Sequence, residues 1–496
     1  MIGTLSFSML ASSAHADWSE ASSEHFIIYG DQSEKSLRLF AERLELFHAT
    51  MAQVLRKAPP NPSPSSRVTI FVVSSDDEVR KLMQADNSFM KGICRPRAGA
   101  TVALVPQLRH AKSKYELAPE TVLYHEYAHH FMYGITARAY PRWFVEGFAE
   151  FFAGVRFQSK QVDLGMPAAH RAMELVRSTH VPIRELLSMA GGKREPNSTY
   201  DAFYGQSWAL FRCRQFSPER AGQLGRYQAL LAQGKPALEA AEGAFGDLDE
   251  LEKDVRIYWN RASMIHLSIG RDTLQIGLID VSQLPPGPAA MMPITMRSKI
   301  GLSEEDAAAL LPEAQQLAAQ YPEDADVLAV LAAVELAAGN DDTAIATADR
   351  ALAIDPKNIS AQLQKGYAVF HKVESGALPR ESWAWVRNEF AKANAIENNH
   401  PIPLIQFYRS YRVQGVKLTP NAVDGLASAM QLAPFDSSVR WMLSQQLISD
   451  KRLAEATEVL APLAYSPHRN EFTDRALELL LDVQARIESE QGQNRD

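Results

Sequence analysis

The chain has 496 residues, 46% of them hydrophobic and 22% charged, which is the composition of an ordinary globular protein with room for two or three domains. Its formal net charge of -8, without a dense block of Lys or Arg, argues against a nucleic-acid partner. No apolar run reaches the length of a membrane-spanning helix, so no transmembrane segment is predicted.

Residues 1–16 have the features of a signal peptide. Ile2 to Leu10 is a short apolar core, and Ala14-His15-Ala16 is an A-x-A cleavage site. Cleavage there would start the mature chain at Asp17 and predicts a periplasmic or secreted protein. No Lys or Arg precedes the apolar core, which leaves two alternatives open: a leader longer than these residues, or an ordinary cytosolic N-terminus.

Residues 17–115 are predicted to form a small α/β layer. His25 to Tyr29 is a short strand ended by a Gly-Asp turn. Residues 33–56 have large apolar side chains at three- and four-residue steps, which predicts a helix. Arg67 to Val73 and Gly99 to Val105 have the β-branched and small apolar composition of two further strands.

Residues 116–265 are predicted to be mainly helical and to contain the chemistry. Pro119-Glu120 begins one helix, which Gly134 ends, and Pro141-Arg142 begins a second after a short loop. The short loop lets the two helices fold back on each other. Further helices are expected around Ser207, over Tyr227 to Ala232 and over Asp247 to Arg261.

The C-terminal half is predicted to be a repeat array over residues 301–486, after a linker with short strands at 266–300 and before a polar tail at 487–496. Prolines 322, 356, 401, 434 and 467 end comparable units, with gaps of 34, 45, 33 and 33 residues. This is the tetratricopeptide period, with an insert of roughly three helical turns in the long gap. We expect three to five helix pairs, whose concave face would bind a protein partner.

The stretch His125-Glu126-Tyr127-Ala128-His129 is the strongest chemical signal. On a helix its two histidines lie one turn apart on the same side and could bind one zinc ion. Glu126 beside them would act as general base toward a zinc-activated water. Seventeen residues after the second histidine, Glu146 would be a third ligand and leave the fourth position open, as catalytic zinc requires.

Three further side chains are candidates for this site. Glu150 lies one helical turn after Glu146 and either accepts the free ring N–H of a ligating histidine or is a solvated glutamate. The oxyanion formed during hydrolysis needs a hydrogen-bond donor, for which Tyr204 is the first candidate and Tyr200 the second.

Other residues with reactive side chains are assigned no role in the site. His130 points about 100° away from His129 around the helix, so it is not expected to be a ligand. Cys94 and Cys213 could pair in an oxidising compartment, but two separate thiols is the preferred interpretation.

The segments H-E-Y-A-H-H and P-R-W-F-V-E-G-F-A-E-F resemble the gluzincin zinc metallopeptidases, the thermolysin-like clan. The stretch W-x-x-E-G-F-A is similar to the second zinc motif of the M1 aminopeptidases. As a whole, the chain resembles bacterial exported proteins that join a gluzincin-like "peptidase MA" domain, here roughly residues 20–265, to tetratricopeptide repeats, here 300–486.

This resemblance implies zinc ligands at His125, His129 and Glu146, with Glu126 as general base. Tyr204 falls where related proteins have a Tyr-x-Gln helix. The strand from Ala100 to Val105 would be the edge on which an extended peptide docks. The G-A-M-E-N stretch of the M1 aminopeptidases is absent, which favours an endopeptidase over an aminopeptidase.

The predicted fold is therefore an α+β N-terminal layer with a helical thermolysin-like zinc peptidase domain, followed by an all-α tetratricopeptide-type solenoid. The predicted function is a zinc-dependent peptidase with Zn2+ as cofactor, whose repeats recruit a protein partner or substrate. The alternative is a protein-interaction scaffold in which the peptidase-like module is catalytically weak or inactive.

Overall fold

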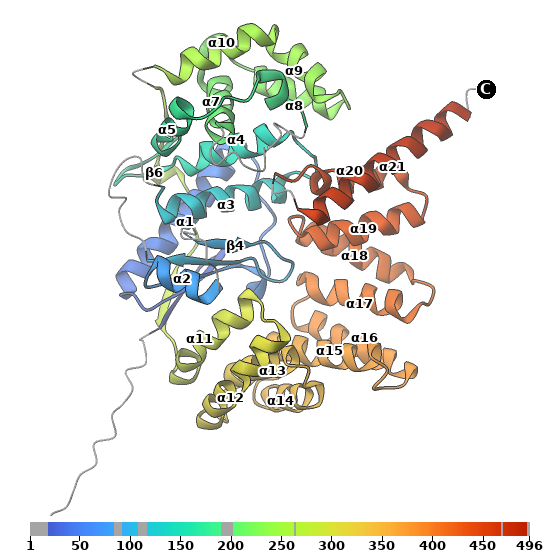
Figure 1. Cartoon of the computed structure of the whole chain (residues 1–496). Coiled ribbons are helices and arrows are strands. Elements are labelled where there is room, and N and C mark those ends of the chain that lie inside the picture. Colours follow the sequence, from blue (N-terminus) through green and yellow to red (C-terminus); the bar gives the residue numbers. More distant parts are fainter. Residues whose placement is uncertain are drawn as a thin grey trace, which may run out of the picture.

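The computed structural model describes residues 18–83, 92–107, 117–189, 202–261, 264–467 and 470–493. An α/β sheet layer and a helical layer form one module, and a curved array of helices lies alongside it (Figure 1). The predicted signal peptide lies outside the described residues. Within them, no helix is both long enough and apolar enough to cross a membrane.

The sheet layer has six strands in the order β4-β5-β3-β2-β1-β9. In chain order the strands are β1 Ser19–Ser22, β2 Phe26–Gly30, β3 Val68–Val73, β4 Ile93–Arg95, β5 Val102–Pro106 and β9 Asp280–Gln283. Strands β2, β3 and β5 are parallel, whereas β4, β1 and β9 are antiparallel to their neighbours. Every residue of β3 is buried, because helices cover this central strand on both faces.

Helices pack on both faces of the sheet. They are α1 Glu34–Leu55, α2 Asp76–Met83 and α11 Pro286–Ile300. α1 buries one stripe of side chains, including Leu37, Phe40 and Leu44, in the main core of the module. On the opposite face, Val79 of α2 and Met292 of α11 share a second core with the strands. The α/β layer predicted for this part of the chain is present.

The segment 266–300 contains two short strands, as predicted, β8 Leu267–Gly270 and β9, but it ends in a helix and not in a linker. Residues 286–300 form α11, and only the end of the predicted strand Leu274 to Val281 belongs to β9. The Pro-rich stretch suggested a linker, but Pro286 occupies the first turn of α11, where a missing backbone N–H breaks no helical hydrogen bond.

The strand predicted as the docking edge, Ala100 to Val105, is not at the edge of the sheet. Its structural counterpart β5 pairs with β3 on one side and with β4 on the other. The sheet order places β4 outermost on this side. Any peptide that extends the sheet here would therefore have to pair with the three residues of β4.

The helical layer packs against the sheet layer through the main core of the module, and it includes a small second sheet. Its helices are α3 Pro119–Ile135, α4 Arg142–Ala153, α5 Ala169–Arg177, α6 Ile183–Leu186, α7 Phe203–Phe216, α8 Gln223–Ala232, α9 Ala237–Phe245 and α10 Leu248–Trp259. The small sheet consists of β6 Arg156–Phe157, β7 Gln161–Leu164 and β8 Leu267–Gly270. All twelve residues of α4 are buried, so α4 is the central helix of this layer.

The array is a solenoid of antiparallel helix pairs, as in tetratricopeptide repeats. Its helices are α12 Glu304–Gln320, α13 Ala325–Ala337, α14 Asp341–Ile354, α15 Ile359–Glu374, α16 Trp383–Ile396, α17 Pro401–Gln414, α18 Pro420–Leu432, α19 Ser437–Ser449, α20 Leu453–Ala464 and α21 Glu471–Gln493. Small residues such as Ala344, Ala348 and Ala351 are fully buried, which lets neighbouring helices approach closely.

The period of the array follows the prolines. Within the described residues, α13 to α20 make four successive pairs. Pro356 and Pro434 each follow the second helix of a pair, and Pro322 follows α12, the helix before the first of these pairs. The long gap contains the turn from Ser375 to Ser382 inside the pair α15 and α16, so the extra residues lie in that pair. The predicted polar tail at 487–496 begins inside α21, which continues to Gln493.

Candidate metal centre

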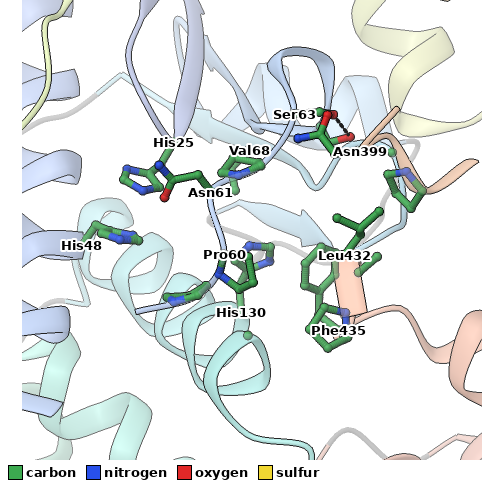
Figure 2. Close-up of a pocket in the computed structure, with 18 of the residues that line it drawn as sticks. His25, His48, Pro60, Asn61, Ser63, Val68, His130, Asn399, Leu432 and Phe435 are labelled. Carbon is green, nitrogen blue, oxygen red and sulfur yellow. Dashed lines mark hydrogen bonds between the residues drawn. The ribbon is translucent and has the colours of Figure 1, made fainter. Parts of the chain in front are cut away.

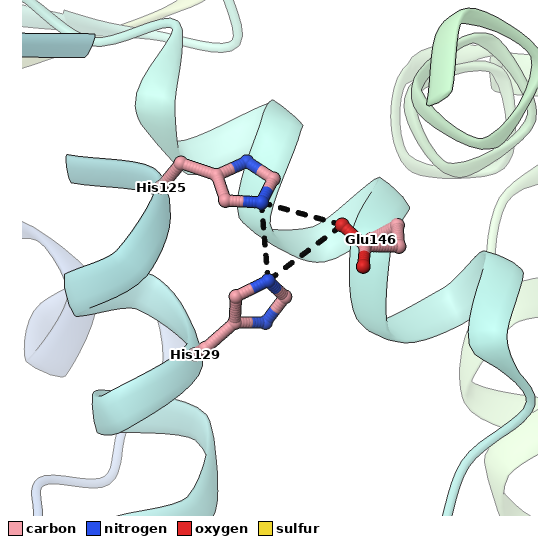
Figure 3. A group of neighbouring side chains, drawn as sticks. All are labelled: His125, His129 and Glu146. Atoms are coloured by element: carbon pink, nitrogen blue, oxygen red, sulfur yellow. Dashed lines mark hydrogen bonds and ion pairs between the residues drawn. The ribbon is translucent and has the colours of Figure 1, made fainter. Parts of the chain in front are cut away.

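Two neighbouring helices position the candidate ligands. α3 begins with Pro119 in its first turn and ends at Ile135, with His125 and His129 in its middle. α4 packs against α3 and contains Glu146. Figure 3 shows both imidazoles of α3 turned toward the Glu146 carboxylate of α4. The short loop between the helices brings these residues together, as the sequence predicted.

The three donor atoms converge on one point. Nε2 of His125 lies 3.1 Å from Nε2 of His129. Oε2 of Glu146 lies 3.3 Å from the first nitrogen and 3.6 Å from the second. Ligand atoms held about 2.0–2.1 Å from a tetrahedral zinc ion lie about 3.4 Å apart. The spacing of the three atoms therefore fits the three protein ligands of a tetrahedral zinc site.

Burial of the carboxylate supports this assignment. Glu146 is 0% exposed, and neither of its oxygens has a hydrogen bond of normal geometry among the described residues. A buried carboxylate needs a cationic partner or a metal ion. The donor set of two imidazole nitrogens and one carboxylate oxygen is one that zinc accepts, so the residues present fit the ion.

The charges within the cluster are strongly coupled. Burial alone would lower the pKa of His125, but the carboxylates of Glu146 and Glu150 raise it to about 10. Burial would likewise raise the pKa of Glu146, and the two imidazoles lower it well below its ordinary value instead. In the absence of a metal ion, a proton on the imidazole thus compensates the buried negative charge.

Glu150 holds the opposite side of the His125 ring. Its Oε1 lies 3.2 Å from Nδ1 of His125, and its Oε2 lies 3.3 Å from Nε2 of His170. The Arg171 guanidinium also donates to Glu150. Burial would raise the pKa of Glu150, but Arg171, His125 and His170 together hold it well below the ordinary value. A charged acceptor at Nδ1 leaves Nε2 of His125 facing the centre.

α5 contributes residues that sequence reasoning missed. His170 and Arg171 both contact Glu150, and Arg171 Nη1 also donates to Glu174 at 3.2 Å. The Arg171 guanidinium lies 4.7 Å from the centre of the Tyr204 ring. The sequence offers one weak signal for these contacts, a His-Arg pair at the start of an amphipathic helix, and nothing in its spacing points to Glu150.

Glu126 and Tyr204 come from two different helices, α3 and α7. Glu126 follows His125 on α3 and is half-buried, close enough to β4 for its charge to act on the Cys94 thiol. Tyr204 is in the first turn of α7, where burial and then the charge of Glu146 raise its pKa to about 12. The hydroxyl of Tyr204 is therefore protonated and able to donate a hydrogen bond. Tyr200 lies outside the described residues.

The residues to which no role was assigned lie apart from the three donors. The His130 ring faces Phe435 of the array, with ring centroids 4.1 Å apart. Cys94 on β4 and Cys213 on α7 are two separate thiols. Burial raises the pKa of Cys94, which keeps that thiol protonated.

No protein-family model matches the chain, and no curated protein matches it either. Among solved structures, TTC0263, a thermophilic TPR protein of Thermus thermophilus, is similar at 19% identity and a TM-score of 0.33, over 39% of this chain and 99% of that one. Yeast Tom70 is similar at 13% identity and a TM-score of 0.28, over 62% and 70%. MamA is similar at 13% identity and a TM-score of 0.27, over 41% and 99%.

Proposed function

We propose that the array binds a protein partner or substrate and that the module beside it is a zinc-dependent peptidase of gluzincin type. The observation that carries the enzymatic part is the convergence of His125, His129 and Glu146, whose donor atoms have tetrahedral spacing. The recruiting part is supported by the architecture of stacked helix pairs, whose concave faces suit extended protein surfaces.

Each residue of the centre has a part in the proposed hydrolysis. Zinc bound by the three donors would supply Lewis acidity, which polarises a carbonyl and lowers the pKa of water to about 7. Glu126 accepts a proton from the attacking water and passes it to the leaving amine, as the C–O bond forms and the C–N bond breaks. The Tyr204 hydroxyl donates to the oxyanion. Glu150 holds His125 by its Nδ1.

The first test is metal content. Purified full-length protein is expected to hold about one zinc ion per chain, and His129→Ala is expected to lose it because two donors no longer enclose the ion. His371→Ala is the matched control, since it removes an exposed imidazole of the array that pairs with Asp341. Equal zinc content in wild type and His129→Ala would refute the metal centre.

The second test is turnover. Cleavage of a broad peptide library is expected to depend on Glu126 and to include peptides with blocked N-termini, since internal cleavage is proposed. Glu126→Ala is the blank, because it removes the base and keeps all three ligands. Zinc-loaded wild type that cleaves no more than this blank would refute the peptidase.

A second candidate function is a protein-interaction scaffold with a weak or inactive module. It is favoured by a hollow of about 420 Å³ on the array, lined by residues of α13, α15 and α17, including Tyr367, Phe370 and Arg409. The first helices of three successive pairs thus form one continuous surface. Binding of a protein partner that is unaffected by Glu126→Ala, together with no cleavage, would establish the scaffold.

Export belongs to the same proposal. The A-x-A stretch at 14–16 leads us to propose a periplasmic or secreted location. Cell fractionation with an antibody against the array tests this directly. Recovery of the whole protein in the cytosol, with residues 1–16 still attached, would contradict it.

A further inference from the structure

The turn between α18 and α19 packs against the module next to the metal helix. Asp436 is the N-cap of α19, where its Oδ1 accepts from the backbone N–H groups of Ser438 at 2.8 Å and Val439 at 3.0 Å. Its Oδ2 accepts from the backbone N–H of Ala98 at 2.6 Å. Ala98 lies in the turn between β4 and β5, so one carboxylate joins the array to the outer strand of the sheet.

Phe435 in the same turn reaches α3. Its ring centroid lies 4.1 Å from that of His130, which is stacked on Tyr127 at 5.6 Å. Tyr127 in turn hydrogen-bonds His48 of α1 at 2.7 Å. Figure 2 shows Phe435 and His130 side by side at the wall of a cavity of about 50 Å³, with His48 beyond them. The array thus contacts the side of α3 that faces away from Glu146.

Arg440 on α19 contacts the last turns of α3. It is 3% exposed, and its guanidinium lies 5.9 Å from the centre of the Tyr133 ring. It donates to the backbone oxygens of Pro434 at 2.7 Å and Val459 at 3.3 Å, with no carboxylate partner among the described residues. Tyr133 lies one turn after His129, so this cation rests beside the end of the ligand-bearing helix.

We infer that Phe435 and Arg440 of the array are positioning residues for the metal centre. Phe435 holds α3 from the side away from Glu146, and Arg440 holds it at Tyr133, on the face that also carries His129. Asp436 fixes the adjoining strand turn. A helix that carries two ligands must be held within about 0.5 Å for the donors to meet at one point. The inference rests on the proposed zinc site, although it does not require peptidase activity.

The first experiment measures zinc affinity by competition with a chromophoric chelator in full-length variants. Phe435→Ala is expected to weaken zinc binding about tenfold, the lower end of the effect of removing a direct partner of a metal ligand, because Phe435 acts on the ligands through His130 and α3. Phe435→Leu, which keeps apolar contact with His130, is expected to restore most of it. Phe472→Ala is the matched control, since that ring packs on Trp441 at 5.4 Å in an apolar cluster made of array residues.

Hydrogen exchange of the wild type gives an independent readout. Coupling is reciprocal, so if the docked array raises zinc affinity, zinc must stabilise the docked turn by the same factor. Zinc is expected to slow amide exchange at residues 433–440 in wild type and not in His129→Ala. A purely structural contact would leave both zinc affinity and this exchange unchanged.

The outcomes separate the two proposals. If wild type binds zinc and Phe435→Ala binds it equally well, with no zinc effect on exchange at 433–440, the positioning role is overturned and the metal centre stands. If wild type binds no zinc, the proposed function is overturned, and the inference with it.

Discussion

Glu146 and Glu150 show how neighbours set the roles of two identical, equally buried side chains. They lie one turn apart on α4, at 0% and 2% exposure. Among the described residues, Glu146 lies at ion-pair distance from the Nε2 atoms of two imidazoles, at distances that suit a shared ion. Glu150 is already compensated by Arg171 and His170, so its charge serves to hold His125 instead. Glu146, which is buried without a permanently charged cation beside it, is therefore the candidate ligand, whereas Glu150, which is paired with Arg171, supports His125.

His48 provides a prediction about pH. Burial, then His25, lowers its pKa to about 3, while Glu45 opposes this and His130 adds to it. The folded pKa is below the ordinary 6.5, so between these values the unfolded chain binds a proton that the native chain rejects. The stability due to neutral His48 is therefore complete above pH 6.5 and declines as pH falls, by about 2 kcal/mol from pH 7 to 5.

The measurement is urea unfolding of wild type and His48→Asn at these two pH values. The variant is expected to be less stable at pH 7, because the stacking of His48 on His25 at 3.6 Å is lost, and to have a smaller decline toward pH 5. His371→Asn, on the surface of the array, should decline as wild type does. Parallel declines in wild type and His48→Asn would show that this histidine is not held neutral.

The sequence predicts residues of the centre when the chemistry is local. His125, His129 and Glu146 follow from helical spacing and one short loop, and the structure brings them together. Arg171 does not follow, because its contact with Glu150 depends on the path of β6 and β7 between α4 and α5. A contact between two side chains that depends on the course of the connecting segment leaves no periodic pattern in the sequence.

At the scale of elements, the contact between α4 and α7 keeps Glu146 in place. A Cβ at Gly147 would lie 2.5 Å from the backbone oxygen of Ser207 and 2.8 Å from Cβ of Phe211. Because backbone cannot yield as a flexible side chain does, Gly147→Ala is expected to push α4 away from α7. We expect a loss of stability of about 1–3 kcal/mol and weaker zinc binding, since Glu146 is the preceding residue.

Gly225→Ala is the control for Gly147→Ala. Gly225 is also inside a helix, α8, but a Cβ there meets no atom of the described residues within 4 Å. Its substitution should raise stability by up to about 1 kcal/mol through helix propensity alone. Thermal unfolding measures the stability of both variants, and zinc titration measures their zinc affinity. A Gly147→Ala protein as stable as wild type would rule out the close packing of α4 on α7.

Elements were predictable where a single pattern governs them. The helical periodicity of α1 and the β-branched run of β3 correspond to real elements. α11 was predicted to be a linker, because it begins with prolines. The strand predicted at 274–281 overlaps β9 only at its end, because β9 completes a sheet in which its neighbour, β1, lies some 260 residues earlier in the chain. Pairing over such a separation depends on the assembled module and not on local sequence.

At the scale of the whole molecule, the array and the module share a core. Ala98 of the module lies in one apolar cluster with Ile405, Tyr408 and Leu426 of the array. The backbone N–H of Ala98 donates to Asp436 at 2.6 Å, and Ser65 donates to Glu397 at 2.8 Å. The array is thus attached to the module along several of the array helices. The number of helices and the spacing of the prolines in the sequence do not predict this attachment.

Gly99 tests that attachment. It has a φ of 85°, which favours glycine, and a Cβ there would lie 2.6 Å from Cγ1 of Ile402 on α17. Gly376, between α15 and α16, has a φ of 80°, but a Cβ there meets no described atom within 4 Å. Alanine at either position carries the same backbone strain, roughly 1–2 kcal/mol, so their difference isolates the contact between module and array.

Gly99→Ala is expected to lose about 1–3 kcal/mol more than Gly376→Ala, because the added methyl has to displace the side chains of Ile402 and His400 in the array. The loss should appear as earlier unfolding of the array in calorimetry, and as faster proteolysis between α17 and α19. Both changes are expected if contacts with the module stabilise the array in addition to the contacts between its own repeats. Equal stability of the two variants, with unchanged proteolysis, would mean that the array folds independently of the module beside it.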